Sequence, residues 1–367
     1  MSERIRILLL FGGRSAEHDV SRVTAVAVAR ALDPGRYEVV PVAITTDGRW
    51  LLADAARRAI EAGPNALPTA FEVGGEPAGE LGELATGRPM TTGSALGSID
   101  VVFPLLHGPY GEDGTVQGLL ELADLPYVGC GVVGSAVGMD KVAMKQMFVG
   151  CGLPTPRYLV HRDGHDPITF ADEVVVELGL PCFVKPANMG SSVGVSKARD
   201  RAELDAAIAA ALVFDEWILV EEMVVGREIE VAVLGDDPPE TSVPGEIVPG
   251  AEFYDYADKY EDGAAELLIP SPLDAERTAE VRELAVRAFE ACRLEAMARV
   301  DCFYSDERGF LVNEVNTIPG FTPISMYPRL WEASGVPYAR LLDRLVELAF
   351  ARHARRTARA GRQRDAR

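Results

Sequence analysis

The chain has 367 residues, of which 48% are hydrophobic and 25% are charged, and its formal net charge is −20 at pH 7. This length predicts two or three packed subdomains of a soluble globular protein. The acidic balance argues against a nucleic-acid partner, because phosphate binding requires a basic face. No apolar run approaches the roughly 18 residues of a membrane span, and the start lacks the features of a signal peptide. We therefore expect a cytoplasmic protein without a membrane partner.

The first third of the chain predicts an N-terminal α/β domain at residues 1–129. Residues 4–11 form a continuous apolar run, which is typical of a strand buried on both faces of a parallel sheet. Further elements are expected as a helix over 21–32 and strands over 37–44 and 101–106. The segment 51–98 is rich in Ala, Gly and Pro and predicts an insertion with short elements.

Two more α/β units and a tail follow. The central unit, 130–224, combines helices and strands, expected at 141–149, 182–185, 202–212 and 217–222. The C-terminal unit, 225–352, is expected to hold strands at 228–234 and 310–315 and helices at 274–294 and 338–351. Residues 353–367 carry six Arg and one Asp. This pattern is typical of a solvated, disordered tail, and a partner-binding role is the alternative.

The strongest chemical signal lies near the C-terminus, in Arg299-Val-Asp301 and Asn313-Glu314-Val-Asn316. Because side chains alternate along a strand, Glu314 and Asn316 point to the same face, and Asp301 can lie on the neighbouring strand. Two carboxylates and an amide oxygen suit Mg²⁺. The alternative is that these acids only pair with Arg299 or solvate a sheet edge.

A second signal is Lys185 followed by the loop Gly190-Ser-Ser-Val-Gly194. A lysine that leaves a buried strand can reach phosphates, and a Gly/Ser loop offers backbone N–H groups to anionic oxygens. It is not a Walker P-loop, because Gly-Lys-Ser/Thr before a helix is missing. A flexible turn is the alternative for the loop alone.

Weaker signals lie at other strand ends, where α/β proteins tend to bind ligands. Glu221 and Glu228 flank a strand connector that can bind adenine and ribose, although a charged strand end is the simpler interpretation. Glu17 can bind an ammonium group. His107 lies in a polar turn, where a lone histidine is most often structural. The aromatic loop 253–260 can form a lid or an ordinary surface loop.

Together these motifs resemble the D-alanine–D-alanine ligases of the ATP-grasp superfamily, from about Ile5 to Phe350. The segment 51–98 and the tail lie outside the resemblance. The most specific matches are Gly13-Arg-Ser-Ala-Glu17, His107-Gly108, Gly111-Glu-Asp-Gly-Thr-Val-Gln-Gly118, Met139-Asp-Lys141, Lys185 with Gly190-Ser-Ser-Val-Gly194, Tyr254-Asp-Tyr-Ala-Asp-Lys259-Tyr260, and Asn313-Glu-Val-Asn-Thr-Ile-Pro-Gly320.

The resemblance implies an ATP-grasp fold of three α/β subdomains, with the nucleotide site between the second and third. It also implies ligation of two D-alanines through an acyl phosphate, for peptidoglycan precursors. Its cofactors would be ATP and two Mg²⁺ ions, for which Mn²⁺ can substitute. D-alanine and ATP would be the small-molecule partners, and we expect a homodimer.

Site residues carry over position by position. Nucleotide contacts fall on Lys141, Lys185, Ser191, Ser192, Glu221, Val224, Glu228 and Lys259, and metal ligands on Asp301, Glu314 and Asn316. Substrate contacts fall on Glu17, His107, Lys259, Ser325 and Met326. The catalytic set is Glu17, Ser191, Tyr260, Arg299, Gly320 and Ser325.

Within that set, Glu17 would hold the first ammonium, and Arg299 and the Gly320 N–H would stabilise the tetrahedral oxyanion. Ser191 and Tyr260 would join Glu17 in a network that closes the lid. The alternatives are a ligase of D-alanine with D-lactate or D-serine, and a non-catalytic ATP-binding regulator. Loss of the metal acids or of Arg299 would favour the regulator, and all of them are present.

Overall fold

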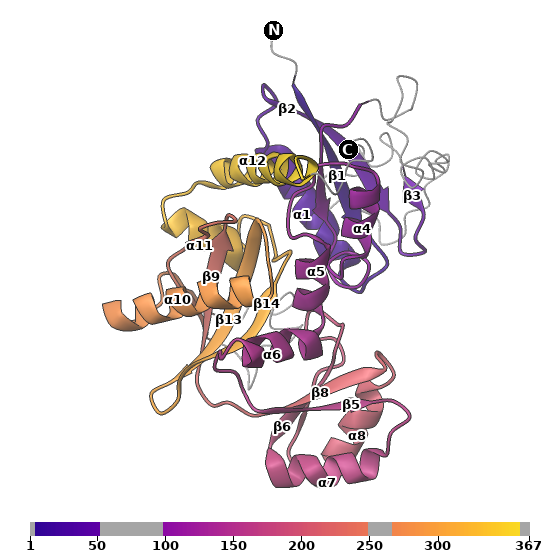
Figure 1. The fold of residues 1–367 in the computed structure, drawn as a ribbon, viewed down its shortest axis with the longest axis vertical. Coiled ribbons are helices and arrows are strands. Elements are labelled where there is room, and N and C mark those ends of the chain that lie inside the picture. Colours follow the sequence, from indigo (N-terminus) through magenta and orange to yellow (C-terminus); the bar gives the residue numbers. More distant parts are fainter. Residues whose placement is uncertain (1–3, 52–97, 249–265, 360–367) are drawn as a thin grey trace.

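The computed structural model describes residues 4–51, 98–248 and 266–359. Three β-sheets, each covered by helices, follow one another along the long axis of the molecule (Figure 1). The sheet formed last in the sequence lies between the other two, so its strands face both of them. The three α/β units expected from the sequence are therefore present.

The N-terminal sheet has the order β3-β2-β1-β4 and is parallel except at its β3 edge. Its elements are β1 (Ile5–Gly12), α1 (His18–Ala31), β2 (Tyr37–Ile44), β3 (Trp50–Leu51), β4 (Val101–Leu105) and α4 (Thr115–Leu122). Six of the eight residues of β1 are buried, as a strand covered on both faces requires. The expected insertion at 51–98 lies almost wholly outside the described residues.

The middle sheet is antiparallel, with the order β5-β8-β6-β7. Its elements are β5 (Tyr158–Arg162), α7 (Pro167–Glu177), β6 (Cys182–Pro186), β7 (Ser196–Ala198), α8 (Arg201–Ala211) and β8 (Trp217–Glu222). Helices α7 and α8 close one core with this sheet. Both begin at an aspartate whose side chain accepts a backbone N–H of the first turn, which ends the preceding loop sharply.

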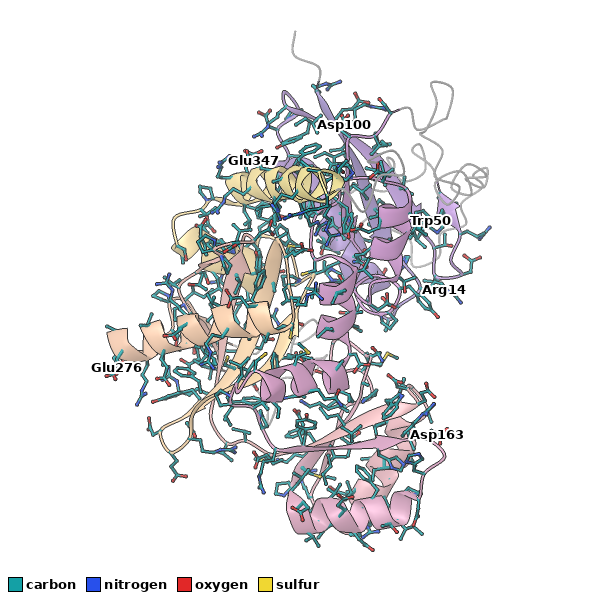
Figure 2. The ribbon with its side chains drawn as sticks, viewed as in Figure 1. Arg14, Trp50, Asp100, Asp163, Glu276 and Glu347 are labelled. Carbon is teal, nitrogen blue, oxygen red and sulfur yellow. The ribbon has the colours of Figure 1, made fainter. Side chains whose placement is uncertain are left out.

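The third sheet is also antiparallel, with the order β12-β11-β9-β13-β14, and β10 pairs with β9. Its strands and helices are β9 (Arg227–Leu234), β10 (Glu240–Thr241), β11 (Gly245–Val248), β12 (Glu266–Leu268), α10 (Ala275–Ala291), β13 (Met297–Ser305), β14 (Gly309–Asn316), α11 (Met326–Ala333) and α12 (Tyr338–Thr357). The exposed acids Asp163 and Glu276 illustrate how charged side chains stay at the periphery (Figure 2).

Helix packing crosses the expected unit boundaries in two places. Helices α5 (Val132–Met139) and α6 (Lys141–Gly150) precede the middle sheet in sequence, yet Met144 and Phe148 pack into the core of the third sheet. At the other end, Leu341 and Leu345 of α12 share a core with Ile7 of the N-terminal sheet. Sequence neighbourhood therefore does not decide which sheet these helices cover.

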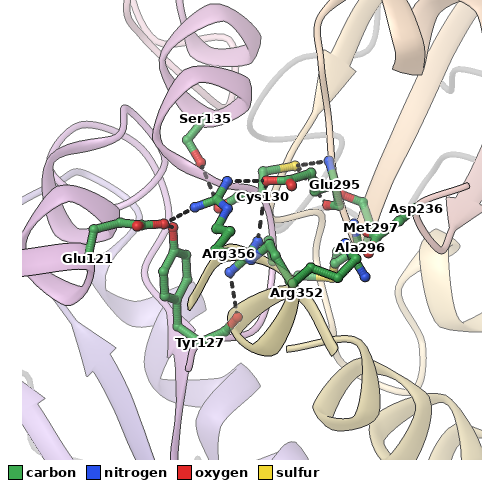
Figure 3. A network of polar contacts seen from close by, with 12 residues as sticks. Glu121, Tyr127, Cys130, Ser135, Asp236, Glu295, Ala296, Met297, Arg352 and Arg356 are labelled. Atoms are coloured by element: carbon green, nitrogen blue, oxygen red, sulfur yellow. Dashed lines mark hydrogen bonds and ion pairs between the residues drawn. The ribbon is translucent and has the colours of Figure 1, made fainter. Parts of the chain in front are cut away.

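The expectation of a disordered tail from residue 353 is wrong for residues 353–357, because α12 continues through Thr357. Arg352 is buried and donates to the carbonyl oxygens of Tyr127, at 2.6 Å, and Gly129. Arg356 pairs with Glu121 and, at 2.8 Å, with Glu295 (Figure 3). The helix continues through these basic residues because acceptors from the N-terminal unit and from the segment before β13 pair with them.

Candidate active site

A cavity of about 700 Å³ lies where the three units meet. Its walls come from the start of α1, from the turn after β4, from α5 and α6, from β6 and the Gly/Ser loop after it, from strands β9, β13 and β14, and from the start of α11. Fourteen residues selected from the sequence line it: Glu17, His107, Lys141, Lys185, Ser191, Ser192, Glu228, Arg299, Asp301, Glu314, Asn316, Gly320, Ser325 and Met326. Segments far apart in the chain thus converge on one space.

The hairpin of β13 and β14 carries the expected metal ligands side by side. Asp301 stands opposite Glu314, and Arg299 stands opposite Asn316. On its other side Asp301 stands opposite Glu230 of β9, which the sequence did not indicate. Because paired residues on neighbouring strands share a face, three carboxylates form one row along the cavity wall.

Arg299 balances part of this negative charge. Its Nε and Nη2 each donate to a carboxylate oxygen of Asp301 at 2.7 Å, and its Nε lies 3.0 Å from Glu230 Oε2. Burial opposes the charged form, but Asp301 and Glu230 outweigh it and raise the pKa of Arg299 well above its usual value. A permanently charged guanidinium therefore faces the cavity.

Two of these carboxylates and a neighbouring amide fit a magnesium ion. Within the described ranges, no group of three or more His, Cys, Asp or Glu side chains is placed to hold a metal ion by itself. Mg²⁺ normally takes only one or two carboxylates and completes its shell with water and substrate phosphates. Asp301, Glu314 and Asn316 supply such a partial set of oxygen ligands, and Asp301 would exchange hydrogen bonds from Arg299 and Asn316 for the ion.

Two lysines and the Gly/Ser loop form the opposite wall. Lys141 Nζ donates to the carbonyl oxygen of Met189 at 2.6 Å, beside the loop. Ser191 and Ser192 have φ values of 47° and 59°, in the left-handed region that non-glycine residues seldom adopt. Successive backbone N–H groups in such a turn form a concave anion site. The loop therefore suits phosphate oxygens.

The loop also reaches across to the N-terminal unit. Ser191 Oγ donates to Glu17 Oε1. Gly190 and Gly108 approach the same carboxylate so closely that a Cβ on either would lie 2.7 or 2.8 Å from Glu17 Oε2. Two of the three members of the expected closing network are therefore in contact, and the two glycines leave room for the Glu17 carboxylate between their backbones.

His107 and Glu112 together hold the backbone N–H and C=O of one residue, Ile318, in the loop after β14. His107 Nδ1 donates to the Ile318 carbonyl at 3.0 Å, and the Ile318 N–H donates to Glu112 Oε1 at 3.1 Å. Burial lowers the pKa of His107, and burial together with Glu17 raises the pKa of Glu112 to about 8. Ile318 lies between Asn316 and Gly320, so this clamp fixes the loop that carries the Gly320 N–H.

Four residues expected in the site are not among those that line the cavity within the described part of the chain. Glu221 is 2% exposed, and its carboxylate turns instead to Lys145, at 2.6 Å, and to Lys185. Val224 is half-buried outside the lining. Lys259, Tyr260 and the rest of the predicted lid lie outside the described residues.

Three contributing residues were missed, although each had a local signal. Glu230 follows Glu228 by two and therefore shares its face. Lys145 follows Lys141 by four, one helical turn further. Glu112 lies within a turn that was interpreted only as polar. Glu230 pairs with Arg299, Lys145 pairs with Glu221, and Glu112 accepts the N–H of Ile318 in the loop that leads to Gly320.

An antiparallel middle sheet facing a second antiparallel sheet across a cavity lined by lysines and carboxylates is the architecture of an ATP-grasp enzyme, and the expected fold is confirmed. The family model described as D-ala D-ala ligase N-terminus matches residues 6–130, and the model described as D-ala D-ala ligase C-terminus matches residues 147–347. The chain therefore belongs to the D-alanine–D-alanine ligase family, and it is a ligase.

Relatives agree over nearly the whole length. A D-alanine–D-alanine ligase from Geobacillus thermodenitrificans is 48% identical over 95% of this chain and 96% of its own, and one from Arthrobacter sp. is 49% identical over 95% and 94%. The solved ligase from Coxiella burnetii has a TM-score of 0.84 at 35% identity, covering 97% of both chains. A D-Ala:D-Ser ligase from Enterococcus faecalis has a TM-score of 0.82 at 32% identity, covering 95% of this chain and 100% of its own.

No helix within the described ranges combines the length and apolarity needed to cross a membrane. The cytoplasmic location and the homodimer stay predictions.

Proposed function

We propose that this protein converts two D-alanines and ATP into D-alanyl-D-alanine, ADP and phosphate, as a step toward peptidoglycan precursors. The observation that carries the proposal is the single cavity in which Glu17, two lysines, Arg299 and the row of carboxylates converge. Phosphoryl transfer and acyl transfer both build negative charge on oxygen, and fixed cationic groups and backbone N–H groups stabilise that charge.

The reaction would proceed in two steps. A carboxylate oxygen of the first D-alanine attacks the γ-phosphorus of ATP, and the bond from that phosphorus to the bridging oxygen of ADP breaks. The amine of the second D-alanine then attacks the carbonyl carbon of the acyl phosphate and loses a proton, and the carbon–oxygen bond to phosphate breaks. Neither step needs a nucleophilic side chain.

The chain's own groups would divide this work. Glu17 would hold the first ammonium, and Lys141, Lys185 and the serine loop would hold the phosphates. Arg299 and the Gly320 N–H would face the tetrahedral oxyanion. Ser325 and the first N–H groups of α11 would receive the second carboxylate, because a helix N-terminus favours an anion. When bound by Asp301, Glu314 and Asn316, Mg²⁺ would neutralise phosphate charge.

Exclusion of water supports the same assignment. An acyl phosphate is lost to hydrolysis unless the site closes around it. The contact between Ser191 and Glu17 joins the central unit to the N-terminal unit at the cavity wall. This contact supports a closed arrangement during the reaction.

A second candidate is ligation of D-alanine to D-serine, because a solved D-Ala:D-Ser ligase has nearly the same fold similarity as the D-alanine–D-alanine ligase from Coxiella burnetii. D-lactate is a further possible acceptor. A non-catalytic regulator is disfavoured, since Arg299, Asp301, Glu314 and Asn316 all line the cavity.

The test measures ADP release and separates products by chromatography, with D-alanine, L-alanine, D-serine and D-lactate offered singly and in competition. We expect turnover only with D-alanine and Mg²⁺ or Mn²⁺, and one dipeptide for each ATP. Turnover with L-alanine but not D-alanine would refute the proposal. A mixed dipeptide or depsipeptide as the main product would favour the second candidates.

A further inference from the structure

A buried ammonium group lies behind the cavity wall and belongs to none of the roles above. Lys145 of α6 has a side chain that is only 1% exposed, and it does not line the cavity. Its Nζ lies 2.6 Å from Glu221 Oε1, 2.8 Å from Thr155 Oγ1 and 3.5 Å from the Val312 carbonyl oxygen. Burying a charge in this way costs free energy, so its place requires an explanation.

Glu221 is shared between two lysines. Its other carboxylate oxygen pairs with Lys185, which does line the cavity. Burial opposes ionisation of Glu221, but Lys145 and Lys185 outweigh it and hold its pKa at about 2. The three groups therefore form a chain of charges, Lys145–Glu221–Lys185, that runs from the protein interior to the cavity wall.

The summed formal charge of Lys145, Glu221 and Lys185 decides how strongly Lys185 attracts an anionic ligand. Glu221 and Lys185 alone would sum to zero, and the attraction of Lys185 for an anionic ligand would be largely cancelled by its partner. With Lys145 the sum is two positive charges and one negative, which leaves one positive charge. That net charge faces the cavity through Lys185, because the other two groups are inaccessible.

The same ammonium group joins structural elements on both sides of the nucleotide cavity. Lys145 comes from α6, which packs against the third sheet, whereas Glu221 belongs to the middle sheet. Val312 lies on β14, two residues before Glu314. Thr155 lies in the connection from α6 to the middle sheet and donates to the Val312 carbonyl at 2.8 Å. Lys145 therefore fixes Lys185 relative to the strand with the metal ligands.

We propose that Lys145 is a positioning residue for nucleotide binding: it neutralises Glu221, so that Lys185 keeps its positive charge for the phosphates of ATP. This inference rests on the proposed function, in that it takes ATP as the ligand of the cavity. It also gives Glu221 a role beside the nucleotide contact implied by the family resemblance, because each of its carboxylate oxygens pairs with an ammonium group.

The decisive comparison is between Lys145→Met and the double variant Lys145→Met/Glu221→Gln. In Lys145→Met the formal charges of Glu221 and Lys185 sum to zero. The dissociation constant and KM for ATP should therefore rise at least about 10-fold, with little change in KM for D-alanine. The double variant restores one positive charge on Lys185. It should bind ATP within about 3-fold of Glu221→Gln alone, which controls for any direct contact of Glu221 with the nucleotide.

Lys185→Met is the matched control, because it removes the ammonium group that faces the cavity. Its loss of ATP affinity should persist when Glu221→Gln is added. Binding is measured by titration calorimetry with ATP and Mg²⁺ in the absence of D-alanine, and a melting curve confirms that each variant is folded. If Lys145→Met alone is too unstable to purify, the comparison of the double variant with Glu221→Gln still tests the inference. In the double variant the Glu221 carboxylate is replaced by an amide, so no buried negative charge is left with only one lysine partner.

Two results would overturn the inference. One is a folded Lys145→Met protein with the ATP affinity of wild type. The other is a folded double variant that binds ATP at least about 10-fold more weakly than Glu221→Gln. The proposed function fails separately: wild-type protein that binds ATP but makes no D-alanyl product would refute the ligase activity while leaving the binding comparison valid.

Discussion

The close approach of Gly190 to Glu17 gives a quantitative test of the role of Glu17. A Cβ at position 190 would lie 2.7 Å from Glu17 Oε2, whereas ordinary contact begins at 3.4 Å. The difference, 3.4 − 2.7, means that the carboxylate or the loop must retreat by about 0.7 Å. Gly190 does not have a positive φ, so alanine adds this contact without backbone strain.

We expect Gly190→Ala to raise KM for the first D-alanine about 10- to 100-fold, because the displaced carboxylate loses its alignment with the ammonium and its hydrogen bond from Ser191. KM for ATP should change much less. The matched control is Gly150→Ala at the end of α6, where a Cβ meets nothing within 4 Å. Initial rates over a range of D-alanine concentrations provide the measurement. An unchanged KM for D-alanine in a folded Gly190→Ala protein would remove Glu17 from the first substrate site.

Three further outcomes are expected. Glu314→Gln should lower kcat roughly 10²-fold in ADP-release assays across Mg²⁺ concentrations, whereas Glu276→Gln, on the exposed start of α10, should not; equal rates would reduce Glu314 to a solvated strand residue. Glu112 has a folded-state pKa raised to about 8, so it binds more protons folded than unfolded between roughly pH 4.3 and pH 8. Wild type should therefore lose stability relative to Glu112→Gln as pH rises through that window, by at most about 1.4 kcal/mol per pH unit, and parallel melting curves from pH 5 to 9 would contradict this. Deletion of 355–367 should lower the melting temperature by several degrees, because the ion pairs of Arg355 and Arg356 are lost. Deletion of 360–367 is the control, and equal melting temperatures for the two truncated proteins would show that these pairs contribute no stability.

Local patterns predicted the placement of Asp301, Glu314 and Asn316 on paired strands, because the strand period and a hairpin act over a short range. Their role as metal ligands stays a prediction. Glu314 and Asn316 share a face because of the strand period, and the hairpin brings Asp301 opposite Glu314. Glu230 joins the same row only through pairing of β9 with β13, about 70 residues away. The strand period places Glu230 on the face of Glu228, but it does not encode which strand lies beside β9, so the place of Glu230 next to Asp301 was not foreseen.

The acidic strand end at Glu221 and Glu222 shows a second limit. Neighbouring residues on a strand face opposite sides, so the two acids have different fates. Glu221 turns inward to Lys145 and Lys185, whereas Glu222 binds Arg157 at 2.9 Å and Arg308 at 2.8 Å. The sequence gives the alternation but not which face meets lysines, and both partners of Glu222 come from distant segments.

The end of α12 was underestimated for a related reason. Composition alone treats an Arg-rich segment as solvated, because it offers no apolar face. In the fold, Glu121 of the N-terminal unit and Glu295 of the third sheet both lie within reach of Arg356. Charges that look unpaired in a sequence become pairs when separate units supply the opposite sign.

Choice of the second substrate depends on few side chains, because ligases with different acceptors share this fold. The solved D-Ala:D-Ser ligase and the solved D-alanine–D-alanine ligase from Coxiella burnetii differ by only 0.02 in TM-score to this chain, 0.82 against 0.84. Ser325 and Met326 line the cavity at the start of α11, where any acceptor carboxylate would be held alike. D-serine, like D-alanine, attacks through an amine, so discrimination against D-lactate is the case that must act on the attacking group, an amine in D-alanine and a hydroxyl in D-lactate. From the family resemblance we expect this discrimination to fall to Tyr260 with Glu17 and Ser191, and we predict that the tyrosine favours the dipeptide at neutral pH. The ratio of dipeptide to depsipeptide, measured with D-alanine and D-lactate in competition from pH 6 to 9, tests this preference directly. A product that is mostly depsipeptide at pH 7 would contradict it.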